Sequence, residues 1–182
     1  ISILQKLNLK GNSDYIEIYI KNEDDYSEEN TVILPIDETD CIIHREIELG
    51  DFKNIQGIRI DPSNKHCAIK IISIKGILTN GKKCDLSKNI SVNADKVIQS
   101  DIFIFKFNDS QILIEKNVML LDLSKLIIEI EYIAKNLKSI LILEELYEEK
   151  NSLNELINKF DEQNERLIDI INEKERVTQY LN

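Results

Sequence analysis

Hydrophobic and polar side chains alternate over short stretches in the first part of the chain. In residues 15–21, YIEIYIK, every second side chain is an isoleucine, and the others are tyrosine, glutamate or lysine. A period of two residues is typical of a β-strand with one buried face. Comparable apolar stretches cover residues 31–34, 41–49, 55–60, 68–78, 101–107, 111–115 and 125–133.

Turn-forming residues separate these predicted strands. All five glycines and both prolines lie within the first 81 residues, where they break the apolar stretches apart. No helical period falls between the strands, which argues against a doubly wound α/β fold. Eight short strands joined by turns predict a mainly β domain over residues 1–134, an antiparallel β-sandwich of the jelly-roll kind.

The hydrophobic period changes after Ile133. In residues 135–182, apolar side chains recur at the a and d positions of a seven-residue repeat, and nine of these twelve positions are apolar. The pattern predicts a long coiled-coil helix that joins copies of the chain into a homo-oligomer. Ile157 and Ile171 widen the apolar stripe and leave the number of copies open. The apolar residues expected at the seam are Leu146, Leu153, Leu156, Phe160, Leu167, Ile170, Val177 and Leu181.

An alternative places the same residues in one amphipathic helix that folds back on its own sandwich. A helix of this length is not expected to be stable in water without a surface to cover its apolar side. Both interpretations satisfy that requirement, and they differ in whether the surface belongs to another copy of the chain.

Charge and composition exclude several classes of partner. The net charge is −10, and both the predicted sandwich and the predicted helix are acidic, so no basic face for nucleic acid is expected. No apolar stretch approaches the roughly 18 residues of a membrane helix, so no membrane insertion by this chain is expected. The chain begins with Ile1 rather than methionine, so we expect it to be part of a longer protein, whose other parts could still attach it to a membrane.

Cysteine usage indicates the compartment. The three cysteines are Cys41, Cys67 and Cys84, and an odd number in a domain with enough apolar residues for its own core argues against a disulfide framework. Reduced thiols predict a cytoplasmic location.

Two groups of residues could in principle hold a metal ion. Cys41, His44, His66 and Cys67 include the ligand types that zinc prefers, but neighbouring strand positions point to opposite faces, so no zinc site is expected. The acidic segment 22–30 offers weak calcium candidates in its carboxylates. It lacks the ligand spacing of an EF-hand, which makes a hydrated hairpin tip the simpler interpretation. The calcium candidates are Asp24, Asp25, Glu28 and Glu29.

The sequence offers little for catalysis. It contains neither a glycine-rich phosphate loop nor a G-x-S-x-G nucleophile motif, and it has only two histidines. We therefore expect no catalytic residue, no cofactor and no enzymatic activity from this chain alone.

Tyrosines are the candidate ligand-binding residues. Sugar-binding sandwiches stack aromatic rings on sugar rings, and this chain has no tryptophan. Tyr15 and Tyr19 share one face of a predicted strand with Glu17, and Tyr26 follows in the next loop. These three tyrosines could bind an oligosaccharide, although ordinary cross-strand packing of aromatic side chains explains the pattern equally well.

Three segments together resemble a known family. They are YSEEN at residues 26–30 with LPI at 34–36, IRIDPSN at 58–64, and CAIKI at 67–71 with IK at 74–75. They are similar to the accessory, carbohydrate-binding-module-like sandwich of large bacterial glycosyltransferases, and of some methyltransferases, of surface-polysaccharide assembly. The resemblance covers about residues 13–133, and Tyr26 stands where the family often has phenylalanine. The family's catalysis resides in other domains, so no catalytic residue carries over.

The resemblance implies a function. We expect a non-catalytic accessory or scaffold region of a glycosyltransferase-type protein that oligomerises or positions the enzyme and could bind glycan. A head-and-stalk structural protein of the adhesion or fibre type, without sugar binding, is the alternative.

Overall fold

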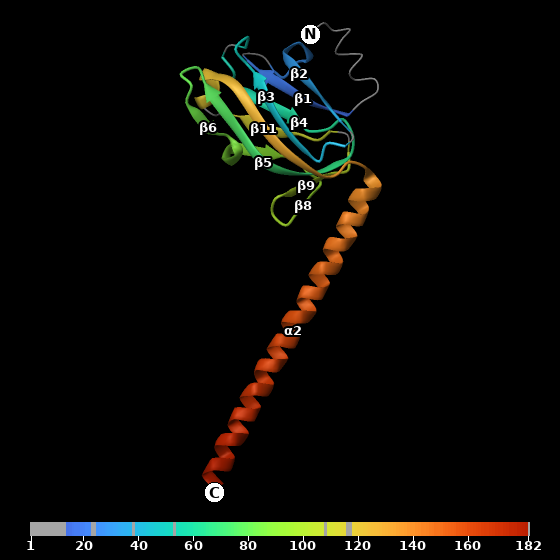
Figure 1. The fold of residues 1–182 in the computed structure, drawn as a ribbon, viewed down its shortest axis with the longest axis vertical. Helices are drawn as coiled ribbons and strands as arrows, with labels where there is room; N and C mark the ends of the chain where they lie inside the picture. The colour runs from blue at the N-terminus through green and yellow to red at the C-terminus, as the bar shows by residue number, and fades with distance from the viewer. Residues whose placement is uncertain are drawn as a thin grey trace. The chain divides into compact units, whose positions relative to one another are not determined.

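The chain is mainly β, with two antiparallel sheets and one long C-terminal helix (Figure 1). The structure is a computed structural model and describes residues 14–22, 25–37, 39–52, 54–107, 109–115 and 118–181. The prediction of a mainly β chain that ends in a long helix is confirmed at this level.

The first sheet has five strands in the order β2–β1–β4–β10–β7. Each neighbouring pair is antiparallel. The alternation predicted for residues 15–21 is present in β1, where Ile16, Ile18 and Ile20 are fully buried and the residues between them lie on the opposite, outer face. The strands are β1 (Asp14–Lys21), β2 (Thr31–Ile36), β4 (Gly57–Asp61), β7 (Ile90–Val92) and β10 (Ile112–Glu115).

The second sheet contains the two longest strands of the molecule. Its order is β3–β11–β5–β9–β8, and β6 pairs with β5 beside this path. The pairing of β11 with β5 shifts register in three places, so these long strands bend along their length. The strands are β3 (Ile42–Glu48), β5 (Cys67–Leu78), β6 (Lys83–Asp85), β8 (Lys96–Ile98), β9 (Ile102–Phe105) and β11 (Leu123–Ala134).

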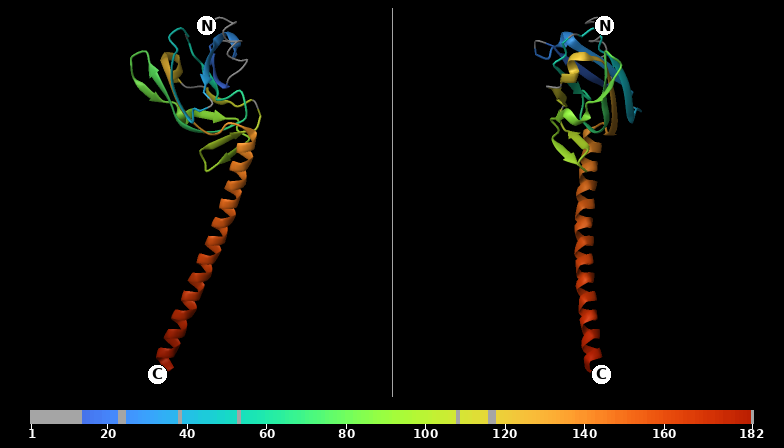
Figure 2. Two further views of the ribbon diagram at one scale, coloured as in Figure 1. Left: turned by 45° about the vertical axis from the view of Figure 1, so that its right-hand side comes forward. Right: turned by 90° about the vertical axis from the view of Figure 1, so that its left-hand side faces the viewer.

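One hydrophobic core contains side chains from both sheets. Ile18 and Ile60 come from the first sheet, and Ile74 and Ile128 from the second, and all four are fully buried. Three short 3-10 turns lie in the described part of the chain. The turn η1 (Glu28–Asn30) joins β1 to β2 within the first sheet, whereas η2 (Ser87–Asn89) and η3 (Val118–Asp122) lie between strands of different sheets. Two further views show the strands of both sheets (Figure 2). We refer to this part of the chain as the β-domain.

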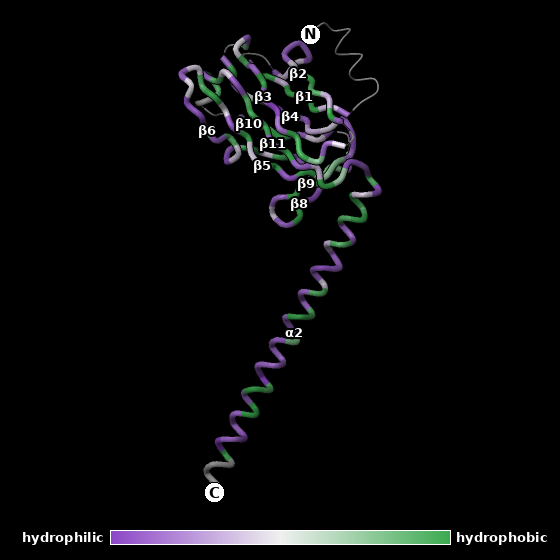
Figure 3. Tube along the Cα trace, viewed as in Figure 1, coloured by the Kyte–Doolittle hydropathy of each residue, from purple (hydrophilic) through white to green (hydrophobic). Residues whose placement is uncertain are grey.

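Helix α2 (Leu137–Leu181) is continuous over 45 residues. Asn136 caps its first turn, because the Asn136 side-chain oxygen accepts a hydrogen bond of 2.9 Å from the backbone N–H of Ser139. The chain divides into two compact units, residues 1–140 and residues 141–182. Ile140, the last residue of the first unit, is fully buried. Apolar and polar segments alternate along α2 (Figure 3).

Candidate functional site

The outer face of the first sheet carries a row of polar and aromatic side chains. In β1 this face bears Tyr15, Glu17 and Tyr19, and in the adjacent β4 it bears Arg59 and Asp61. Glu17 stands directly opposite Asp61, and Tyr19 directly opposite Arg59. Opposed residues on one face of an antiparallel pair are close enough for their side chains to interact.

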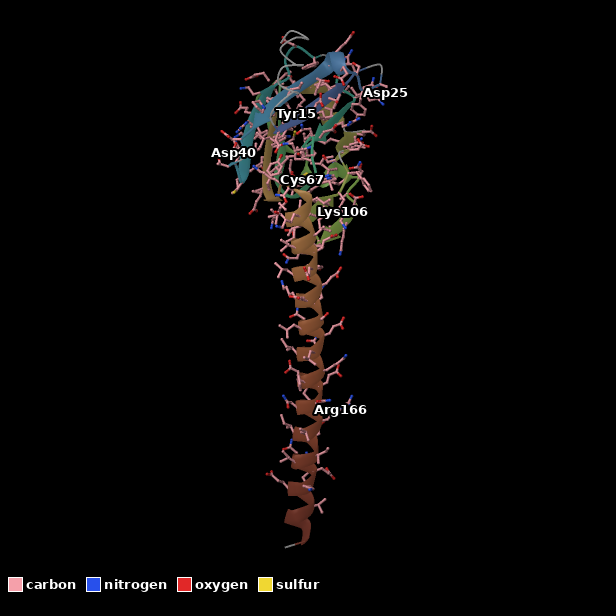
Figure 4. All side chains as sticks on the ribbon, turned by 90° about the vertical axis from the view of Figure 1, so that its right-hand side faces the viewer. Tyr15, Asp25, Asp40, Cys67, Lys106 and Arg166 are labelled. Carbon is pink, nitrogen blue, oxygen red and sulfur yellow. The ribbon has the colours of Figure 1, made fainter. Side chains whose placement is uncertain are left out.

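A hollow of about 240 Å³ lies over these strands. Three segments contribute to it: β1, β4 with the turn that follows it, and the loop between β9 and β10. Figure 4 labels Tyr15 among the side chains of the β-domain. The lining residues are Tyr15, Glu17, Tyr19, Arg59, Asp61, Ser63, Asn64 and Asp109.

Arg59 connects the groups of this hollow. Its Nε donates to Asp61 Oδ1 at 2.8 Å, and its Nη2 donates to Asp61 Oδ2 at 2.6 Å. This two-point pairing of a planar guanidinium with a carboxylate fixes the orientation of both side chains. The guanidinium also lies 4.6 Å from the centre of the Tyr19 ring, a cation–π distance, and its Nη2 lies 3.9 Å from Asp109 Oδ1.

The electrostatics of the hollow reflect partial burial. Burial raises the pKa of Asp61 more than the ion pair with Arg59 lowers it, whereas the hydrogen bond to Asp61 raises the pKa of the Arg59 guanidinium. Burial, followed by a hydrogen bond to the Glu17 carboxylate, raises the pKa of Tyr19 well above its ordinary value. Tyr19 is therefore a neutral phenol at neutral pH.

The turn after β4 is held by several hydrogen bonds. The backbone N–H of Tyr15 donates to Asn64 Oδ1 at 3.3 Å, and Ser110 Oγ donates to the Ser63 carbonyl at 3.0 Å. Tyr132 lies on β11 of the second sheet, and its hydroxyl donates a hydrogen bond to the Pro62 carbonyl. These bonds hold Ser63 and Asn64, which line the hollow.

Tyr26 lies outside the lining of the hollow, unlike the other two candidate tyrosines. Its hydroxyl donates to Glu115 Oε1 at 3.1 Å, and Lys21 Nζ lies 5.5 Å from the centre of its ring. A methyl group added at Gly57 would come within 2.7 Å of the Tyr26 hydroxyl oxygen, so the absence of a side chain at Gly57 makes room for it. Tyr26 thus packs across the first sheet in the way that cross-strand aromatic side chains do.

The metal candidates are not brought together in the described part of the chain. Asp25 lies on the loop after β1 (Figure 4) and accepts a hydrogen bond from the Tyr26 backbone N–H at 2.9 Å, while Glu28 and Glu29 lie in η1. Asp24 falls outside the described residues. Within those residues, no group of three or more His, Cys, Asp or Glu side chains is arranged to hold a metal ion.

The cysteines occupy three different environments. Cys41 is exposed, Cys84 is half-buried, and Cys67 is buried, all with free thiols. Burial raises the pKa of the Cys67 thiol to about 12, so this side chain is a neutral, apolar part of the core at neutral pH. It is one of the residues labelled in Figure 4.

The apolar side chains predicted for the seam lie along α2 and are exposed. Leu146 is 58% exposed and Phe160 56% exposed, and the other seam residues up to Val177 are similar. The side chain of Leu181 lies outside the described part. Side chains project from the helix on all sides, as around the labelled Arg166 (Figure 4). Across the part of the chain that the structure describes, no helix is long and apolar enough to span a membrane.

Sequence reasoning assigned two of the eight hollow residues a role, Tyr15 and Tyr19. It placed Glu17 on the same strand face without a role, and it assigned none to Arg59, Asp61, Ser63, Asn64 or Asp109. A signal for four of these was present, because Arg59 and Asp61 occupy alternate positions of a strand and Ser63 and Asn64 follow in its turn. Asp109 is 48 residues beyond Asp61 along the chain, and nothing in the local sequence indicates that it returns to the same place.

A comparison with known protein families, curated proteins and solved structures finds no match to this chain.

Proposed function

We propose that this chain is a non-catalytic accessory module that assembles through α2 and carries a glycan-binding β-domain. In this proposal it belongs to a glycosyltransferase-type protein of bacterial surface-polysaccharide synthesis, where it joins or positions copies of the enzyme. The three free thiols support a location in the reducing cytoplasm.

Strand topology supports a jelly-roll-like sandwich for the β-domain. Successive strands alternate between the sheets: β2 lies in the first sheet, β3 in the second, β4 in the first and β5 in the second. The same alternation returns in β9, β10 and β11. Chains that cross repeatedly between two facing sheets are typical of jelly rolls and related Greek-key sandwiches.

The observation that carries the assembly proposal is the exposed apolar column of α2. Leu153, Phe160 and Leu167 follow each other at intervals of seven residues, and each is more than half exposed. Complete burial of such side chains is worth roughly 1.5–3 kcal/mol each, and a single helix gains none of it. Every copy of the chain has the same column, so a second copy supplies a matching apolar surface.

Polar residues interrupt the column and restrict how helices align. Glu149 and Gln163 fall at d positions and Lys174 at an a position. Polar groups at a seam lower stability, yet they favour the one alignment in which they find partners or water. In the proposed coiled coil, the polar positions therefore select one register of the helices, and the apolar positions stabilise their association.

Sedimentation equilibrium of the full chain tests the assembly proposal. We expect a defined oligomer, and we expect Phe160→Asp to weaken association at least about hundredfold, since a large seam side chain is lost and a charge is buried. The matched control is Asn158→Asp, which adds the same charge at an outward f position and should leave association unchanged. A wild-type chain that stays monomeric at every soluble concentration contradicts the proposal.

A further inference from the structure

The hollow on the first sheet contains more negative than positive charge. Three carboxylates line it, those of Glu17, Asp61 and Asp109, and one guanidinium, that of Arg59. Glu17 is nearly inaccessible to solvent, and Asp61 is mostly buried. Because water screens partly buried charges less well than exposed ones, a ligand that enters the hollow meets a negative environment.

The charged groups of the hollow are mainly acceptors, since three carboxylates face one guanidinium. Two N–H groups of Arg59 already donate to Asp61, and Asp109 Oδ1 accepts a hydrogen bond of 2.6 Å from Gln111 Nε2. Each carboxylate offers about four lone-pair sites, so acceptor capacity remains after these bonds. A complementary ligand must therefore bring donors, which means hydroxyl groups or an ammonium group. A phosphate or carboxylate brings only acceptors and negative charge.

Size and aromatic character narrow the ligand further. A volume of about 240 Å³ lies just below the range of roughly 300–1,000 Å³ that is typical of small-molecule sites, so the hollow fits one ring of a larger ligand. Tyr15 and Tyr19 add apolar ring surface and a hydroxyl each. Arg59 covers part of Tyr19, and both tyrosines are half-buried.

We propose that the hollow binds one ring of a carbohydrate that is neutral or carries an amino group, and that it rejects carbohydrates bearing carboxylate or phosphate. This inference rests on the glycan-binding part of the proposed function and is independent of assembly through α2. It is more specific than a general affinity for sugars, because it fixes the sign of the charge that the ligand can carry.

Nuclear magnetic resonance on the full chain tests this inference directly. The chain has four arginines, so the side-chain Nε–H signals are few, and loss of one signal in Arg59→Lys assigns the reporter of the hollow. The probes are methyl glycosides in the gluco, galacto and manno series, each as the amino sugar, the neutral sugar and the uronate. The Nε–H of Arg45, on β3 of the other sheet, is the internal control.

We expect the amino and neutral members of at least one series to shift the Arg59 signal saturably, while the Arg45 signal stays in place. The uronate of the same series should bind at least about fivefold more weakly. Equal or tighter binding of the uronate overturns the charge rule. The absence of a shift in all three series overturns the site, and an equal shift with calcium or spermidine alone shows a cation site instead.

A pair of matched variants examines the origin of the charge preference. Asp109→Asn removes one carboxylate from the rim, and the Asp109 side chain is 71% exposed, so the fold should not change. We expect the difference in affinity between amino sugar and uronate to narrow. Asp40→Asn is the control, because Asp40 is likewise paired with an arginine, at 3.7 Å from Arg45, but on the other sheet. An unchanged difference in Asp109→Asn contradicts the inference.

Sedimentation of the same samples separates the two proposals. A chain that assembles but binds no sugar removes the glycan-binding proposal and leaves assembly standing. A monomeric chain that still binds amino or neutral sugars removes the assembly proposal and leaves the hollow as inferred.

Discussion

Side chains in the β-domain either pack in its interior or form hydrogen bonds between segments of the chain. Three tyrosines do both, since Tyr19, Tyr26 and Tyr132 combine partly or fully buried rings with hydrogen-bonded hydroxyl groups. Tyr26 bonds Glu115 across the first sheet, and Tyr132 bonds the turn after β4 from the second sheet. The bonds of Tyr26 and Tyr132 do not follow from local sequence, because their partners are far away along the chain, whereas the partner of Tyr19 is Glu17, two positions before it on the same strand.

Their shared chemistry predicts how the fold responds to alkali. Burial raises the pKa of Tyr19, Tyr26 and Tyr132 well above the ordinary value of 10.0. A raised folded-state pKa gives stability that is complete below the unfolded-state pKa and is lost as pH rises above it. We therefore expect the free energy of unfolding to fall above about pH 10, because the unfolded chain releases these protons first.

Tyrosinate absorbance and circular dichroism measure this response together. The buried phenols should ionise in one step that coincides with the loss of the β-sheet signal. Ionisation of all six tyrosines near pH 10, with the sheet signal intact, contradicts the burial of these three side chains.

Ile140 and Leu141 provide a matched pair of adjacent positions in α2. Ile140 is fully buried, whereas Leu141 is 52% exposed. Ile140→Ala should lower the free energy of unfolding of the β-domain by about 2–4 kcal/mol through the cavity that it leaves. Leu141→Ala should change it by less than about 0.5 kcal/mol. Urea unfolding of both variants measures the difference, and equal effects contradict the placement of Ile140 in the first unit.

At the scale of elements, strands of four or more residues were predictable and the three-residue strands were not. Apolar side chains alternate with other residues in β1 and β11, and β5 is a twelve-residue stretch rich in apolar side chains; both patterns are visible in sequence. By contrast, β6, β7 and β8 have three residues each, too few to show a period. Their extended conformation depends on pairing with neighbouring strands, which is a property of the tertiary structure.

The same limit applies to the candidate site. Alternation in β1 placed Tyr15 and Tyr19 on one face, and that prediction required only local geometry. The pairing of β1 with β4, which puts Arg59 beside Tyr19, is a long-range contact between segments that sequence alone does not align. The position of Asp109 in the hollow could not be predicted for the same reason, because the loop that carries it is far from β1 and β4 along the chain.

Close packing of β5 against its neighbours gives an element-scale prediction. A methyl group added at Gly76 would collide with Leu123 Cδ1 and would lie 2.8 Å from Cys84 Sγ. Leu123 is buried, so the neighbours have little room to move, and Gly76→Ala should destabilise the β-domain by about 1–3 kcal/mol.

Gly50→Ala is the control for this substitution, because a methyl group at Gly50 meets nothing within 4 Å. It should leave stability unchanged or raise it slightly, since alanine restricts the unfolded chain. Thermal unfolding of both variants gives the comparison. Equal melting temperatures contradict the tight contact between β5, β6 and β11.

For the whole molecule, the two compact units should unfold separately. The β-domain has its own core, so its melting temperature should not depend on protein concentration. An α2 helix that is stabilised by association should melt at a temperature that rises with concentration. Circular dichroism during heating, repeated over a wide range of protein concentrations, distinguishes the two transitions. A helix melting temperature that does not change with concentration contradicts assembly through α2.

The length of α2 also determines how several β-domains would act together. At 1.5 Å per residue, 45 residues span about 68 Å. In a parallel bundle the N-terminal ends of the helices meet, so the attached β-domains share a small volume and their hollows act at a high effective concentration. Sites that bind one sugar ring weakly then hold a polymer of such rings with an avidity far above that of a single site. In an antiparallel bundle the domains are attached at opposite ends, and each copy would reach a separate stretch of polymer.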